Sequence, residues 1–137
     1  MKKSVLLAVL ILISGMMYGQ NLQKGNLIGT HVMTVTLNPG ITMEKYLDFC
    51  NTKLIPEMEK AMPGWKCYLV KGLRGENPDS YGMIYVIKSQ ADRDKYYNAD
   101  GTDSELGKKA NEKLKPLTDE LTKMGTFTTK YTDWVVL

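Results

Sequence analysis

The sequence is short of the residues from which metal and redox centres are built. It contains one histidine, His31, and two cysteines, Cys50 and Cys67, among 137 residues. Structural zinc sites take about four Cys or His ligands, so these residues cannot form one. A haem-attachment motif, a phosphate-cradling glycine loop and the nucleophile elbow of a serine hydrolase are also missing. We therefore expect no metal and no cofactor.

An excess of charge of one sign is lacking as well. The whole chain has 18 Lys and Arg against 15 Asp and Glu. Lys2 and Lys3 lie in the first 20 residues, so the remainder has 16 basic and 15 acidic residues. A nearly balanced domain has no basic surface of the kind that holds phosphate backbones, and we expect no binding to nucleic acid.

The first 20 residues have the pattern of a cleaved signal peptide. Two lysines precede the apolar run Val5–Ile13, and the small residues Ser14, Gly15 and Gly19 follow it. The alternative is a retained membrane anchor, but a span needs about 20 apolar residues and this run is shorter. We predict cleavage after Gly19 or Gln20, a secreted or periplasmic protein, and no contact with the membrane after cleavage.

Residues 21–137 are predicted to form one domain of the α+β class. β-Branched and aromatic runs predict strands, an apolar stripe behind the capping residue Thr42 predicts one helix, and a capping box of Ser89 with Asp92 predicts another. Pro56 is expected to interrupt the first helix. The predicted strands cover 27–37, 65–71, 81–88 and 127–136, and the predicted helices cover 43–62, 90–97 and 104–124.

The order β-α-β-β-α-β is the ferredoxin-like arrangement, a four-stranded antiparallel sheet with its helices on one face. Such a sheet normally leaves its other face polar, yet the third strand is apolar on both. Tyr81 and Tyr85 lie on one side, Ile84 and Val86 on the other. Helices can cover only one side, so we expect a homodimer that buries the second. The sequence leaves open which side that is.

The two cysteines are predicted to be free, buried thiols. Cys50 lies early in a helix that ends near Met62, about 18 Å away at 1.5 Å per residue. Cys67 lies only three residues beyond Gly64, about 10 Å back along a strand. The remaining gap exceeds the roughly 4.4–6.8 Å between Cα atoms that a disulfide allows. We therefore expect no disulfide between them, although the oxidising compartment would permit one.

The order and spacing of several short segments resemble the dimeric α+β barrel superfamily, whose ferredoxin-like subunits pack sheet to sheet. The similar segments are 30–35, Ile55-Pro56-Glu57-Met58, Pro63-Gly64-Trp65 and 81–86 followed by Ser89. The superfamily includes antibiotic-biosynthesis monooxygenases that work without a cofactor, polyketide cyclases and haem-binding proteins. Its stress-responsive A/B barrel branch often carries a histidine and a tyrosine where His31 and Tyr81 stand. The His-Pro-x-His run of that branch is replaced here by residues 98–101.

His31 is the leading candidate for chemistry. In this fold the first strand lies between the third and the fourth, antiparallel to both, which places His31 near Tyr85 and near Tyr131 or Asp133. A histidine between a tyrosine and a carboxylate is suited to act as a general base, with Tyr81 or Tyr85 as proton donor. The alternative is a histidine that is hydrogen-bonded within the core.

Strand aromatics suggest a binding pocket beside this histidine. The predicted ligand-binding residues are Trp65, Met83, Tyr131 and Asp133. The alternative is that the aromatics only pack the core. The leading hypothesis is a homodimer that binds a small hydrophobic or aromatic molecule; if it is an enzyme, it carries out cofactor-independent acid/base chemistry. The rival is a non-catalytic dimeric protein whose sheet serves assembly or partner contact.

The export hypothesis has a direct test. N-terminal sequencing of the protein recovered from its native host should begin near Gln20, Asn21 or Leu22, because the signal peptidase removes the preceding segment. An intact Met1 in most molecules would contradict it.

Overall fold

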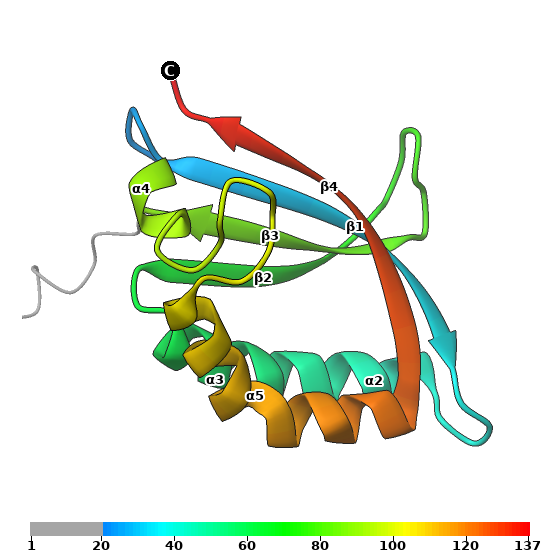
Figure 1. The fold of residues 1–137 in the computed structure, drawn as a ribbon. Coiled ribbons are helices and arrows are strands. Elements are labelled where there is room, and N and C mark those ends of the chain that lie inside the picture. Colours follow the sequence, from blue (N-terminus) through cyan, green and yellow to red (C-terminus); the bar gives the residue numbers. More distant parts are fainter. Residues whose placement is uncertain (1–20) are drawn as a thin grey trace, which may run out of the picture.

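The computed structural model describes residues 21–137, which form a four-stranded sheet with a layer of helices on one side (Figure 1). The predicted signal peptide lies outside the described residues. The strands are β1 (Leu27–Leu37), β2 (Trp65–Lys71), β3 (Tyr81–Ile87) and β4 (Gly125–Val135). Each begins and ends within two residues of its predicted position.

The sheet has the order β2-β3-β1-β4 with every neighbouring pair antiparallel. β1 therefore lies between β3 and β4, as predicted, and the ferredoxin-like class is confirmed. In the register of these pairs, His31 lies opposite Met83 on β3 and opposite Tyr131 on β4. β2 and β4 are the two edges.

The first helical segment begins at the predicted cap and is interrupted as predicted. The Thr42 side chain accepts a hydrogen bond from the Lys45 N–H at the start of α2 (Met43–Phe49). The chain then passes through a π-helical stretch, η1 (Cys50–Leu54), into α3 (Ile55–Ala61). Pro56 stands in the first turn of α3, where its missing N–H breaks no hydrogen bond of that helix.

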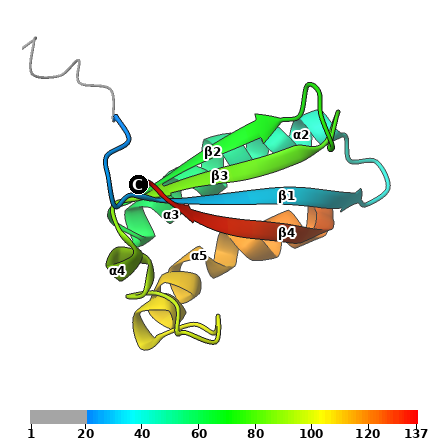
Figure 2. The same ribbon diagram turned by 90° about the horizontal axis from the view of Figure 1, so that it is seen from above.

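The second helical segment is divided more sharply than the sequence predicts. Ser89 caps α4 (Gln90–Arg93), which is a single turn and ends four residues before the predicted Tyr97. A loop then leads to Ser104, which caps α5 (Glu105–Met124). α4 and this loop lie at the end of the sheet where β1 begins and β4 ends (Figures 1 and 2).

The helices cover one face of the sheet and leave the other open. Figure 2 looks onto the open face, with α2, α3 and α5 behind the strands. Leu27, Met33, Trp65, Cys67 and Ile87 point to the helices and are buried. The open face carries Ile28, Val32, Tyr68, Val70, Ile84, Val86 and Trp134. The sequence leaves open which side of β3 the helices do not cover. In the structure it is the side of Ile84 and Val86.

Both cysteines are buried and free, as predicted. Burial raises the pKa of the Cys50 thiol to about 11 and that of the Cys67 thiol to about 12. Both are therefore protonated at neutral pH and act as small apolar groups in the core.

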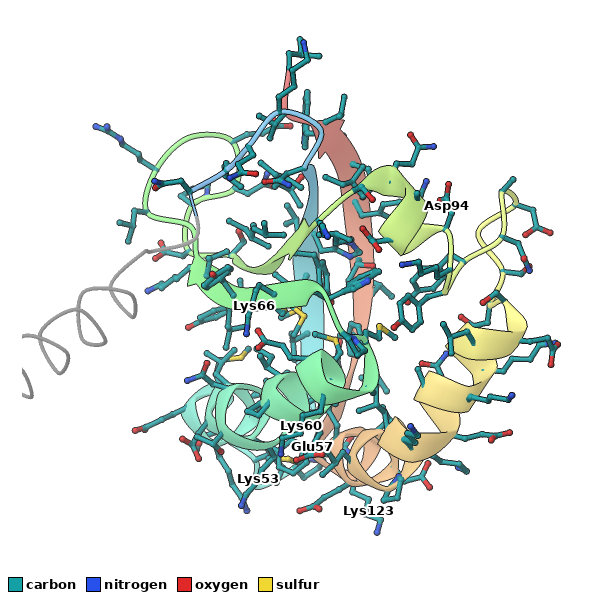
Figure 3. All side chains as sticks on the ribbon, turned by 90° about the vertical axis from the view of Figure 1, so that its left-hand side faces the viewer. Lys53, Glu57, Lys60, Lys66, Asp94 and Lys123 are labelled. Carbon is teal, nitrogen blue, oxygen red and sulfur yellow. The ribbon has the colours of Figure 1, made fainter. Side chains whose placement is uncertain are left out.

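The outer surface of the helices is charged and solvated (Figure 3). Glu57 and Lys60 form an exposed ion pair of 2.6 Å, in agreement with the alternating charges of this helix. Glu59 has a structural role instead: it accepts from Lys66 Nζ at 2.6 Å and from the Cys67 N–H at 3.0 Å, which ties α3 to β2. No helix within 21–137 is long and apolar enough to cross a membrane.

Candidate functional site

A cavity of about 230 Å³ lies on the helix side of the sheet, at the end where α4 packs. Its floor is formed by β1, β3 and β4, and its walls by α3 and the segment from α4 to the start of α5. Its lining residues are Gly29, His31, Met58, Met62, Trp65, Tyr85, Ile87, Arg93, Tyr97, Gly101, Tyr131 and Asp133.

The register of β1 creates the floor of this cavity. Gly29 lies opposite Tyr85 on one side and opposite Asp133 on the other. A Cβ atom at Gly29 would lie 3.1 Å from Asp133 Oδ1 and 3.6 Å from His31 Nε2. Because glycine has no side chain, both polar groups can approach the backbone closely at this point of the cavity lining.

Aromatic rings follow one another around the wall. His31 stacks on Tyr131, with ring centroids 5.2 Å apart and planes at 19°, and meets Tyr85 edge-on at 4.8 Å. Trp65 meets Tyr85 edge-on, with ring centroids 5.8 Å apart, and lies tilted against Tyr97 at 6.0 Å. These separations are typical of favourable aromatic pairs, so the rings support each other and present apolar surface to the cavity.

One ion pair lies in the cavity lining, between Arg93 and Asp133. Arg93 Nη1 lies 2.9 Å from Asp133 Oδ2, and Arg93 Nε lies 2.7 Å from Asp94 Oδ1. The first contact joins α4 to β4 across 40 positions of the sequence. Arg93 and Asp133 carry the only formal charges among the lining residues at neutral pH, so the lining is neutral overall.

Burial sets the protonation of the ring residues. It lowers the pKa of His31 below its ordinary value of 6.5, while the Asp133 charge acts in the opposite direction more weakly. It raises the pKa of Tyr85 and of Tyr97. At neutral pH the imidazole is therefore uncharged and able to accept a proton, and both phenols are protonated.

Two polar groups of the lining lack partners within residues 21–137. The His31 imidazole has no hydrogen bond or ion pair with any described residue, and the buried Nε1–H of Trp65 has none either. Tyr85 differs, because its hydroxyl donates to Met83 Sδ at 3.1 Å. Buried polar groups are normally paired, so the buried Trp65 N–H indicates a place where a bound molecule could supply the partner, and the half-buried His31 imidazole lies in the same lining.

The structure brings together most of the residues singled out from the sequence. His31, Trp65, Tyr85, Tyr131 and Asp133 all line the cavity.

Tyr81 and Met83 do not line it. Tyr81 lies opposite Met33, one full pleat beyond the partner of His31, and packs on the cluster around Met33. Met83 is buried in that same cluster. Of the two tyrosines considered as proton donors, only Tyr85 contacts His31, and it does so through its ring.

Sequence reasoning missed Arg93 and Tyr97 in particular. Both belong to the segment after Ser89, which shows no apolar periodicity to mark an inward face. Strand order could have predicted their position. This segment follows the end of β3, and β1 begins and β4 ends at the same end of the sheet, so the segment lies near His31 and Asp133.

Comparison with known proteins finds similarity in structure alone. No protein-family model matches the sequence, and no curated protein matches it. SnoaB, a cofactor-independent oxygenase from Streptomyces nogalater, has a TM-score of 0.49 and 11% identity, covering 82% of this chain and 94% of its own. A conserved protein from Methanosarcina mazei Go1 has a TM-score of 0.47 and 16% identity, covering 81% of this chain and 93% of its own.

The strand order and antiparallel pairing of this chain establish its ferredoxin-like fold directly, without these neighbours. The function of either neighbour belongs to that protein.

The lowered pKa of His31 predicts how stability depends on pH. Between the folded pKa and the ordinary value of 6.5, the unfolded chain binds more protons than the folded one, so the free energy of unfolding falls as the pH drops through this range. Denaturant unfolding at pH 7.5 and pH 5.5 should show this fall for the native chain. His31→Gln should show less of it, since no other histidine titrates there. A native chain that is equally stable at both pH values would contradict a half-buried imidazole that is neutral in the folded state.

Proposed function

We propose that this protein is exported, acts as a homodimer, and binds a small hydrophobic or aromatic molecule in the cavity beside His31. The observation that carries the proposal is the combination of an aromatic wall with two unpaired polar groups, the His31 imidazole and the Trp65 N–H. Ligand sites are typically apolar with a few convergent polar groups.

The volume limits the size of the ligand. A dry apolar cavity of roughly 150 Å³ can hold a benzene molecule. A cavity of about 230 Å³ therefore suits one substituted ring or a compact bicyclic molecule. The aromatic rings favour a flat ligand, because offset stacking and edge-on contacts need planar partners.

His31 supports acid/base chemistry on such a ligand. Its imidazole is uncharged at neutral pH, and it lines the cavity next to Gly29. A ligand that presents an acidic proton there would give it to His31, and the protonated phenol of Tyr97 or the N–H of Trp65 would stabilise the anion that remains. These steps use side chains alone.

The dimer is supported by the open face of the sheet. Ile84 and Val86 on β3 and Val32 on β1 lie on this face, with no helix above them. Trp134 lies across it, 59% exposed, with its Nε1–H on Thr30 Oγ1 at 3.3 Å. A second copy would bury this surface against an identical one, as in two-fold interfaces generally. The same face also supports the rival function, a dimeric protein without a ligand.

Binding of 1-naphthol tests the ligand site. Isothermal titration should detect it in the native protein. Tyr131→Leu should weaken it several-fold, because Tyr131 stacks on His31 at the mouth of the cavity. Phe127→Leu is the matched control: Phe127 lies four residues earlier on the same face of β4, is similarly exposed, and does not line the cavity.

His31→Ala separates the two candidate functions. Since His31 has no hydrogen-bond partner to leave unsatisfied, the variant should lose 1-naphthol binding at a cost of only about 1 kcal/mol of stability, from aromatic contacts. Strong destabilisation with unchanged binding would end the catalytic proposal for His31, and a native protein that binds no 1-naphthol would favour the rival function.

Light scattering tests the dimer. Residues 21–137 should have about twice the monomer mass at micromolar concentration, and Ile84→Lys should halve it, because an unpaired charge at a desolvated interface costs several kcal/mol. Leu106→Lys is the control, since Leu106 is an exposed apolar residue of α5 in the helix layer. Val32→Lys repeats the test at a more exposed position if Ile84→Lys fails to fold. A native chain that stays monomeric would refute the dimer.

A further inference from the structure

We propose that Arg93 is a positioning residue of this cavity: it holds the Asp133 carboxylate by one oxygen, screens its charge, and so keeps His31 available as a proton acceptor. The inference rests on the proposed function only in treating this cavity as the site.

The geometry of Arg93 is fixed from two sides. Its Nη1 binds Asp133 Oδ2 at 2.9 Å, and its Nε binds Asp94 Oδ1 at 2.7 Å. Asp94 directly follows α4 and is labelled in Figure 3. The guanidinium is planar, so contacts at two of its edges determine the orientation of the whole group. The side chains of Arg93 and Asp133 are only 30% and 26% exposed, which limits screening of their interaction by solvent.

The other oxygen of Asp133 and the histidine lie close to the same point at Gly29. Oδ1 and His31 Nε2 are 3.1 and 3.6 Å from the point where a Cβ of residue 29 would stand. Even so, no hydrogen bond or ion pair of 4.0 Å or less joins His31 to Asp133. The carboxylate is engaged by Arg93 instead.

Two charged groups belong to the cavity lining beside His31: Asp133 from β4 and Arg93 from α4. The other titratable groups that face His31 are Tyr85 from β3, Tyr131 from β4 and Tyr97, which follows α4. Burial raises the pKa of Tyr85 and of Tyr97, so both are uncharged at neutral pH. Asp94 pairs with the Nε of Arg93 and is not part of the lining. The charges of the lining that act on His31 are therefore one carboxylate and the guanidinium paired with it.

Removing the Arg93 side chain should favour protonation of the His31 imidazole. Without the guanidinium, the full charge of Asp133 would act on the imidazole, and the carboxylate would be free to accept a hydrogen bond from it. Both effects favour the imidazolium, which has no lone pair with which to accept a proton. Arg93 would thus maintain the proton acceptor without touching it.

The test uses the single histidine as its own probe. The ring signals of His31 are titrated by NMR in the ligand-free protein, so the readout needs no ligand. Arg93→Gln should raise the pKa of His31 by about one unit, in the range produced by a nearby opposite charge. Lys95→Gln is the matched control: it removes a positive charge from the same segment, but Lys95 pairs with Asp92 and does not line the cavity.

Asp133→Asn should shift the pKa of His31 in the opposite direction to Arg93→Gln. Removing the carboxylate should lower the pKa of His31, and in this background Arg93→Gln should lose most of its effect. The proposal is overturned if a folded Arg93→Gln leaves the titration of His31 unchanged, or if Lys95→Gln shifts it as much. If Arg93→Gln does not fold, an unchanged or raised pKa in Asp133→Asn overturns it. Failure of ligand binding with these shifts intact would count against the proposed function alone.

Discussion

The pairing of β1 with β3 on one side and β4 on the other is the constraint on which the site depends. Because side chains alternate across a strand, this register puts Gly29 and His31 on the helix side together with Tyr85, Tyr131 and Asp133. A slip of one residue in β1 would turn His31 and Met33 to the open face and bring Thr30 and Val32 into the core. The buried Leu27 and Met33 oppose that slip, so core packing and site geometry are secured by the same contacts.

The helix layer accounts for the position of the cavity along the sheet. α2, η1, α3 and α5 fill most of the covered face with three clusters of buried side chains. At the end where β1 begins, α4 is a single turn followed by a loop, which covers the sheet less completely than a long helix would. Trp65 and Ile87 still pack on Met62 and Ala110 there. The cavity therefore lies on packed core residues and is bordered by the loop that follows α4. Binding sites are often arranged this way, with loops placed by a rigid scaffold.

The sequence contains the local information for nearly all of this fold. Thr42, Ser89 and Ser104 begin helices because their hydroxyls accept the first free N–H groups, and Pro63-Gly64 ends one. Strand order alone places His31 near Tyr85, Tyr131 and Asp133. It does not resolve how far along the strand a side chain lies: Tyr81 shares a strand face with Tyr85, four residues away and beyond Met83, yet lies outside the cavity. Arg93 and Tyr97 depend on the path of a loop, which is set by long-range contacts such as the ion pair to Asp133.

The most direct test of the central claim is where a bound aromatic molecule lies. Intermolecular NOEs from 1-naphthol to the protein report this for each ring separately, and the one histidine and two tryptophans give well-separated signals. Ligand protons should show NOEs to the ring protons of His31 and to Trp65. NOEs confined to Trp134 and Tyr68 would place the molecule on the open face of the sheet and would contradict the cavity as the binding site.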